Sequence, residues 1–266
     1  MPDDIKPNGI GASVRRKEDK RFLTGNGRYT ADITRVNQLY VHLVRSVHAH
    51  AEIVSVDTSN ALHADGVVAI YTGEDVAADE IGGPISGWVI TQRDGSANPE
   101  PPHPILANGK VRYVGDHIAA VIAETEQQAI DASELVNVEY KVLPAVVDLA
   151  TSANGAPVHD EVPSNTYFDF ELGDEAATED ALANAATIVE LEVRNNRLIP
   201  NAMEPRAALA EYDPIDGSYT LHTTSQNPHL TRLVIGAFML GIPESKLRVV
   251  APDVGGGFGM KIFNYP

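Results

Sequence analysis

The chain has 266 residues, of which 43% are hydrophobic, so it is long enough to bury the core of one or two domains. Its formal net charge of -17 disfavours nucleic acid as the main partner, because phosphate binding requires clustered lysine and arginine. The sequence contains no cysteine, which excludes disulfides, zinc–thiolate sites and iron–sulfur clusters held by these residues.

The amino-terminal segment is polar. Arg15 and Arg16 precede charged residues rather than an apolar stretch, which is unlike a secretory or twin-arginine export signal. The sequence also lacks any run of about 18 apolar residues, the length that crosses a bilayer. We therefore expect residues 1–19 to form a polar arm on a soluble, cytoplasmic protein without a membrane span.

Residues 20–145 alternate between strand and helix patterns, and we expect them to form one domain of mixed α and β structure. Alternating apolar side chains predict a strand over residues 39–46. Thr125 and Gln128 have the spacing of a capping box, which predicts the start of a helix. Frequent glycine and proline predict a long surface loop over residues 81–104. Further strands are expected over residues 52–56, 66–71, 110–113, 117–123 and 138–140, with a short helix over residues 58–64.

A connection between two domains is expected over residues 146–170, which are rich in proline, serine, threonine and asparagine. The second domain would then occupy residues 171–266, with a short helix over residues 177–186. Apolar and charged residues alternate over residues 189–193, which predicts a half-buried strand with one wet face.

A hairpin and a capped helix are expected next. Strands over residues 207–212 and 219–224 flank an Asp-Gly pair, which suits a tight turn. Asn227 can cap a helix that has Pro228 at its first position and Gly241 just beyond its end. The buried side of this helix is expected to consist of Leu230, Leu233, Val234, Ala237 and Leu240.

A predicted strand over residues 246–251 runs into a glycine-rich stretch at residues 255–259. Four glycines in five positions leave backbone N–H groups open to close approach by an anionic or oxo-bearing group. Nucleotide-binding patterns that start at Gly255 fit poorly, since Met260 stands where both a dinucleotide fingerprint and a Walker loop need glycine. A tight turn whose glycines serve only the backbone remains an open alternative.

Three polar residues outside this stretch are candidates for a site. Gln226 ends a predicted strand just before the capped helix, at the edge where open sheets commonly bind ligands. Its amide could donate to an oxo group, or it could bond to the backbone as an ordinary loop glutamine. Glu204 and Arg206 could form a buried ion pair, line a pocket or lie on a surface turn. The histidines show no spacing typical of a metal cage.

Six stretches occur together in the order and spacing of one family. They are Gly11-Ala12-Ser13-Val14-Arg15-Arg16, Arg21-Phe22-Leu23-Thr24-Gly25 with Gly27-Arg28-Tyr29, Val114-Gly115-Asp116, Met203-Glu204-Pro205-Arg206, Ser225-Gln226 with Pro228-His229, and Gly255-Gly256-Gly257-Phe258-Gly259. Together they resemble the molybdenum hydroxylases, the molybdopterin-binding large subunits of xanthine dehydrogenase-like, aldehyde oxidase-like and carbon monoxide dehydrogenase-like enzymes. The carbon monoxide dehydrogenase-like branch is the most similar.

The resemblance implies an α+β fold, with an α/β hammerhead domain followed by the start of a molybdopterin-binding α/β domain. It implies that Gln226 donates its amide to a molybdenum oxygen. Gly256, Gly257, Phe258 and Gly259 would present backbone N–H groups to that oxygen and to the cofactor. The cofactor would be molybdenum–molybdopterin, in its cytosine dinucleotide form. Its dithiolene sulfurs would hold the metal, without a metal ligand from this chain.

The implied reaction is oxidative hydroxylation of an aldehyde, an N-heterocycle or carbon monoxide, with oxygen from water. Electrons would pass to an iron–sulfur subunit and an FAD subunit, in a dimer of heterotrimers that also contains the rest of the molybdopterin-binding subunit. Ile262 stands where the xanthine dehydrogenase branch has a glutamate, which disfavours purine oxidation.

Family subunits are much longer than this chain, and the catalytic base lies in the part that has no counterpart here. We therefore expect a fragment or one piece of a split subunit, inactive by itself. The alternative is a non-catalytic assembly or binding module of such a complex.

Overall fold

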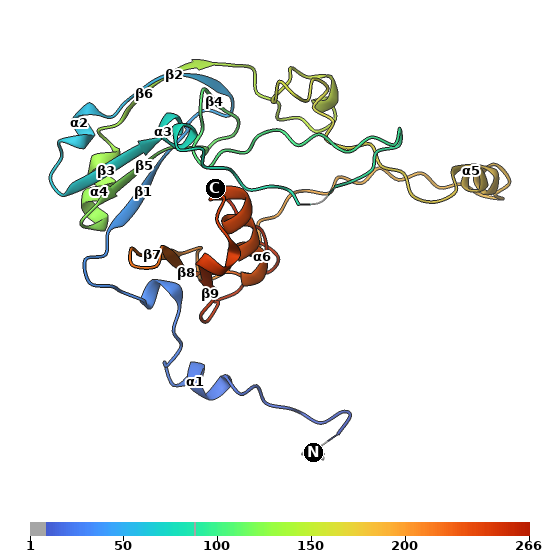
Figure 1. Ribbon diagram of the computed structural model, residues 1–266. Helices are drawn as coiled ribbons and strands as arrows, with labels where there is room; N and C mark the ends of the chain where they lie inside the picture. The colour runs from blue at the N-terminus through green and yellow to red at the C-terminus, as the bar shows by residue number, and fades with distance from the viewer. Residues whose placement is uncertain (1–8, 88) are drawn as a thin grey trace.

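The computed structural model describes residues 9–87 and 89–266, and its first unit is built on two three-stranded sheets (Figure 1). One sheet has the strand order β1 (Tyr40–Arg45), β5 (His117–Ala123), β3 (Val67–Thr72). The other has the order β4 (Lys110–Val111), β2 (Ala51–Asp57), β6 (Asn137–Val142). Every pair in these two sheets is antiparallel.

The core of this unit joins the two sheets. Ile118 on β5 packs with Ala51 on β2, Val111 on β4 and Ala107, and all four are buried. Apolar side chains on β5 are buried on both faces because β5 lies between two neighbouring strands and α4 (Glu126–Ser133) packs against it. The predicted strand over residues 117–123 is therefore confirmed as the central strand.

Two short helices begin close to where the sequence predicted them. Thr125 caps α4, since its Oγ1 accepts a hydrogen bond from the Gln128 N–H at 3.2 Å, and this confirms the predicted helix start. The helix predicted over residues 58–64 is α2 (Ser59–Leu62), and a further one, α3 (Gly73–Ala78), follows β3. The loop predicted over residues 81–104 is confirmed in that its described residues contain only an isolated bridge between Thr91 and Ala97.

The second unit is a three-stranded sheet with a crossover helix. β7 (Ala208–Asp213) and β8 (Ser218–Thr223) form the predicted antiparallel hairpin, and β9 (Leu247–Val250) pairs parallel to β8. The crossover consists of α6 (Pro228–Leu233), the π-helical turn η3 (Val234–Met239) and the 3-10 turn η4 (Glu244–Lys246). Because β9 ends beside β8, the chain enters the glycine-rich stretch next to the residues that follow β8.

The buried side predicted for the crossover helix is partly wrong. Val234 is buried, but Leu233 and Leu240 are 38% and 37% exposed and Ala237 is exposed. For Ala237 and Leu240 the reason is the π turn, in which the Leu240 N–H donates to the Ile235 carbonyl five residues back. Such turns hold more residues than an α-helical turn, so a pattern of period 3.6 falls out of phase after Val234.

The strand predicted over residues 189–193 is wrong. These residues form no regular structure, and Val189, Leu191 and Val193 are 85%, 83% and 71% exposed. No neighbouring strand pairs with them in the described part of the chain, and a lone strand satisfies neither its backbone groups nor its apolar face. They belong to an extended arm that carries α5 (Glu175–Ala183) away from both units (Figure 1).

The remaining elements are short: α1 (Asp19–Leu23), η1 (Thr30–Asp32) and η2 (Ser152–Asn154). The polar arm predicted over residues 1–19 begins outside the described residues, since the structure describes the chain from residue 9. Among residues 9–87 and 89–266, no helix has the length and apolar character needed to cross a bilayer.

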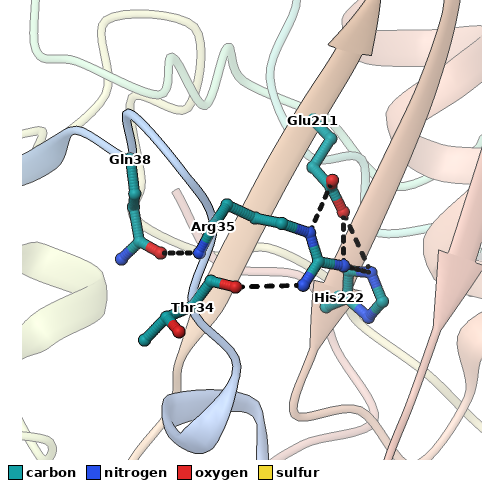
Figure 2. Close-up of polar contacts among 5 residues, drawn as sticks. All are labelled: Thr34, Arg35, Gln38, Glu211 and His222. Atoms are coloured by element: carbon teal, nitrogen blue, oxygen red, sulfur yellow. Dashed lines mark hydrogen bonds and ion pairs between the residues drawn. The ribbon is translucent and has the colours of Figure 1, made fainter.

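Arg35, which follows η1, ties the two units together (Figure 2). Its guanidinium donates to both carboxylate oxygens of Glu211 on β7, at 2.7 and 2.9 Å. Nε2 of His222 on β8 lies 3.2 Å from the same carboxylate. This guanidinium, through its hydrogen bonds, holds the pKa of Glu211 below its usual range. The Arg35 N–H is held in turn by Oε1 of Gln38 at 3.1 Å.

Candidate cofactor-binding site

The glycine loop, residues 255–259, follows β9 and turns through a left-handed backbone. The φ angles are 100° at Gly256, 52° at Phe258 and 88° at Gly259. Glycine takes such angles freely because it has no Cβ, whereas Phe258 bears a strain of about 1 kcal/mol. The Met260 N–H closes the turn by donating to the Gly257 carbonyl at 2.9 Å. The loop is therefore a tight turn.

Gln226 lies against this loop with its amide in one orientation. Its Oε1 accepts hydrogen bonds from the N–H groups of Gly259, at 3.0 Å, and Lys261, at 3.2 Å. Two N–H donors need an oxygen between them, so the amide cannot be turned the other way. Its Nε2 has no hydrogen-bond partner among the described residues, and the side chain is exposed. The NH2 group of Gln226 is therefore left as a donor for a ligand.

The Gln226 side chain packs directly on Gly257. A Cβ at Gly257 would lie 2.4 Å from Cδ and 2.5 Å from Oε1 of Gln226, closer than real Cβ atoms approach other atoms. Any side chain there would displace the glutamine. The loop and Gln226 therefore form one structural unit.

The backbone of Gln226 is also fixed. Its N–H donates to the Lys261 carbonyl at 2.8 Å. On either side, the Asn227 N–H donates to Oγ of Ser225 at 3.0 Å, and that hydroxyl lies 3.2 Å from Oγ1 of Thr231. Ser225 and Thr231 are 7% and 3% exposed. The predicted cap is confirmed, since Oδ1 of Asn227 accepts from the Leu230 N–H. This rigid helix start holds Gln226 in place.

The glycine loop offers further donors. Within the described part of the chain, the N–H groups of Gly256, Gly257 and Phe258 have no hydrogen-bond partner. The Gly259 N–H, which the resemblance assigned to the cofactor, is instead engaged by Gln226, so Gly259 would act through the orientation of that amide. Three consecutive free N–H groups beside an amide NH2 form a small concentration of positive dipoles.

A buried ion pair that the sequence patterns did not predict joins the two ends of the loop. Nζ of Lys261 donates to the carbonyl and to Oε2 of Glu204, at 2.9 and 3.0 Å. Oε2 of Glu204 also accepts from the Gly255 N–H at 2.7 Å. The two side chains are only 3% and 11% exposed. Glu204 thus connects Gly255, the first residue of the loop, with Lys261, which lies two residues beyond the end of the loop.

The possible ion pair between Glu204 and Arg206 is not formed. Arg206 donates to the Met260 carbonyl at 3.0 Å, and its guanidinium lies 3.9 Å from the centre of the Tyr265 ring. The one signal in the sequence for the true partner of Glu204 was Lys261 itself. A lysine close behind a glycine loop needs a counter-charge if its side chain is buried, because burying an unpaired charge is costly.

A cavity of about 660 Å³ lies between the two units, but it is separate from the donors just described. Arg45, His117 and Lys261 are among its lining residues, whereas Gln226 and the glycine loop are not. Burial, and then the nearby charge of Arg45, lower the pKa of His117 below its ordinary value.

The chemistry of the site is that of hydrogen-bond donation. In the described ranges no group of three or more histidine, aspartate or glutamate side chains could hold a metal ion. The free groups are N–H donors, which suit an oxygen that carries negative charge rather than a bare cation. They fit the oxygens of a metal-oxo or phosphate-bearing cofactor.

Comparison with known proteins defines the class of this fold. Residues 24–144 match the family "Aldehyde oxidase and xanthine dehydrogenase, a/b hammerhead domain", and residues 158–266 match the family "Molybdopterin cofactor-binding domain". The protein therefore combines a hammerhead domain with the start of a molybdopterin cofactor-binding domain, as the resemblance implied. It belongs to the molybdenum hydroxylase large-subunit family and corresponds to the amino-terminal portion of such subunits.

Similar proteins include the large chain of carbon monoxide dehydrogenase from Hydrogenophaga pseudoflava, 37% identical over 97% of this chain and 32% of that protein. The large subunit of nicotine 6-hydroxylase from Paenarthrobacter nicotinovorans is 36% identical over 98% of this chain and 31% of that protein. The crystal structure of quinoline 2-oxidoreductase from Pseudomonas putida 86 superposes with a TM-score of 0.81, at 37% identity over 95% of this chain and 31% of that chain. The chain thus spans about a third of the length of these relatives.

Proposed function

We propose that this chain supplies the oxygen-facing hydrogen-bond donors of a molybdenum–molybdopterin site, in an enzyme that performs oxidative hydroxylation. One observation carries the proposal. The Gln226 amide is locked with its oxygen on the Gly259 and Lys261 N–H groups, so its NH2 group is presented outward. A glutamine that served only the loop backbone would need the same acceptor contacts, but it would not need an exposed, unpaired donor beside three free N–H groups.

The residues of this chain fit the group. Gly256, Gly257 and Phe258 would donate hydrogen bonds from their backbone N–H groups to oxygens of the cofactor, and the Gln226 NH2 group would donate one to the oxygen on molybdenum. When bound, the molybdenum group would supply two-electron oxidation of the substrate, with water as the source of oxygen. Fixed donors lower the free energy of negative charge that grows on an oxygen, and they need no rearrangement to do so.

The substrate, the form of the cofactor, the partner subunits and the domain bounds are further proposals. The relatives named above act, by their names, on carbon monoxide, nicotine and quinoline. We propose a substrate from the same range, an aldehyde, an N-heterocycle or carbon monoxide, and the cytosine dinucleotide form of the cofactor. Electrons would leave through an iron–sulfur subunit and an FAD subunit of a dimer of heterotrimers. We also propose domains at residues 20–145 and 171–266, joined by residues 146–170.

The test is the substitution Gln226→Glu in the native assembly that contains this chain. Glutamate keeps the size of the side chain and an oxygen for the Gly259 and Lys261 N–H groups, but it removes the NH2 donor. Activity toward the substrate of the assembly should fall about 100-fold or more, the cost of losing one donor of an oxyanion hole, while molybdenum content and melting temperature stay near those of the wild type.

The matched control is Gln38→Glu. It makes the same change in a glutamine outside the glycine loop and the helix start, whose Oε1 accepts from the Arg35 N–H. Activity should be unchanged in this variant. Full activity in Gln226→Glu would remove the basis of the proposal.

A second function is favoured by the exposed arm. The alternating apolar side chains over residues 189–193 are available for binding another surface, as an assembly module would need. Metal analysis of the native assembly separates the two functions. Molybdenum near one atom per chain supports the cofactor site, whereas a molybdenum-free assembly supports the module. Turnover by the purified 266-residue chain alone would contradict our expectation that it is inactive by itself.

A further inference from the structure

A segment from the beginning of the chain reaches the entry of the glycine loop. Arg21, on α1, pairs its guanidinium with both carboxylate oxygens of Asp253, and the bond from Nη2 to Oδ1 is 2.6 Å long. The two residues are 232 positions apart in the sequence. Asp253 stands two residues before Gly255, so the contact acts where the chain leaves β9 and enters the loop.

Backbone contacts strengthen the same junction. The Arg28 N–H donates to Oδ2 of Asp253 at 2.7 Å, and the Asp253 N–H donates to the Arg28 carbonyl at 3.1 Å. Asp253 is therefore held by residues 21 and 28 through its side chain and its backbone together. Such a junction restricts the position of the loop entry more than a side-chain pair alone would.

The burial of the carboxylate makes the arginine necessary. The Asp253 side chain is 14% exposed and the Arg21 side chain is 41% exposed. Ion pairs on the open surface contribute little to stability, but a largely buried carboxylate that loses its cation is destabilising. The hydrogen bonds from Arg21 and from the Arg28 N–H hold the pKa of Asp253 below its usual range. Without Arg21, the Asp253 carboxylate keeps only the Arg28 N–H of these donors, so the loop entry is held less firmly.

We propose that Arg21 is a positioning residue for the glycine loop, acting through Asp253. The loop is then held from two directions, since Arg21 fixes its entry and the Glu204–Lys261 pair joins its two ends. The segment over residues 19–29 becomes part of the framework of the site, although it supplies none of the free donors. The effect on the loop stands by itself, and the effect on catalysis rests on the proposed function.

The test is amide hydrogen exchange of the loop in the native assembly, followed by mass spectrometry of a peptide that covers residues 253–261. Arg21→Ala should raise the exchange rate of this peptide at least about fivefold, because exchange follows local opening. Arg21→Lys should give a smaller increase, since lysine keeps the charge but not the bidentate geometry. The molybdenum content or the kcat of Arg21→Ala should fall, with KM nearly unchanged.

The matched control is Arg16→Ala. Arg16 lies just before this segment and, among the described residues, its side chain pairs only with Asp19, at 2.9 Å; it is 81% exposed. This variant should exchange like the wild type. Equal loop exchange in Arg21→Ala and Arg16→Ala would overturn the inference, whatever the activities are.

Two further outcomes keep the test decisive. If Arg21→Ala does not accumulate as a folded assembly, Asp253→Asn replaces it, because asparagine keeps the volume and one acceptor but removes the charge. Faster loop exchange in Asp253→Asn supports the inference, and unchanged exchange overturns it. A wild-type assembly without molybdenum would overturn the proposed function, while loop exchange would still decide the role of Arg21.

Discussion

The substitution Gly257→Ala tests most directly whether the glycine loop sets the orientation of Gln226. The new Cβ would lie 2.4 Å from Cδ, 2.5 Å from Oε1 and 2.6 Å from Cγ of Gln226. All three atoms belong to the Gln226 side chain, which is exposed, so the overlap is relieved by movement of that side chain rather than of the backbone. We expect Gln226 to leave its position, and its Oε1 to lose the Gly259 and Lys261 N–H groups.

The size of the effect follows from these contacts. Two hydrogen bonds at a net value of about 1 kcal/mol each make about 2 kcal/mol. Amide exchange at Gly259 and Lys261 should therefore become about 30-fold faster, measured by NMR or mass spectrometry on the chain. In the native assembly, loss of the oriented NH2 group should lower activity by about 100-fold to 1,000-fold.

The control is Gly236→Ala, the same substitution in the same unit. A Cβ at Gly236 would find its nearest neighbour, the Ile242 carbonyl oxygen, at 3.6 Å, which is an ordinary contact. This variant should keep both the exchange rates and the activity. If Gly257→Ala also keeps the wild-type exchange rates and activity, then the loop does not hold Gln226, and the loop does not present its NH2 group as a donor.

Two other predictions concern stability. Lys261→Met removes the cation from a pair whose side chains are 3% and 11% exposed, and it should lower the free energy of unfolding by about 3 kcal/mol, measured by urea denaturation; a loss comparable to that of a surface lysine would contradict the buried pair. Burial lowers the pKa of His117 and His159 below the ordinary 6.5, so the unfolded state binds more protons just below that pH. Stability should therefore be full above about pH 6.5 and fall as the pH drops toward 5.5, with a smaller fall in His117→Gln; a pH-independent free energy of unfolding would refute this.

Local patterns predicted several elements and two helix starts. Thr125 and Asn227 cap helices as predicted, because a cap depends only on residues three positions away. Alternation also predicted β5 and the β7–β8 hairpin. The same pattern failed over residues 189–193, since alternation tells which face would be buried but not whether a partner strand exists. Whether a partner strand exists depends on distant residues, which a local pattern does not include.

Contacts between distant segments were beyond local patterns. Glu204 and Lys261 are 57 positions apart and Arg21 and Asp253 are 232 apart, and charged pairs at such separations have no periodicity by which to recognise them. The motifs that contain Arg21 and Glu204 were visible in the sequence as marks of the family. Their physical reason becomes clear only from the fold, which places both beside the glycine loop.

The orientation of Gln226 shows the same limit at the site itself. From the sequence, donation to an oxo group and ordinary bonding to the backbone were both open for this glutamine. The structure shows that the backbone bonds use the amide oxygen, at 3.0 and 3.2 Å from two loop N–H groups. Because those bonds consume the acceptor, they leave the NH2 donor free rather than occupying it. Bonding of the amide oxygen to the backbone therefore leaves the NH2 group of Gln226 available as a donor. The two alternatives that the sequence left open occur together in one arrangement.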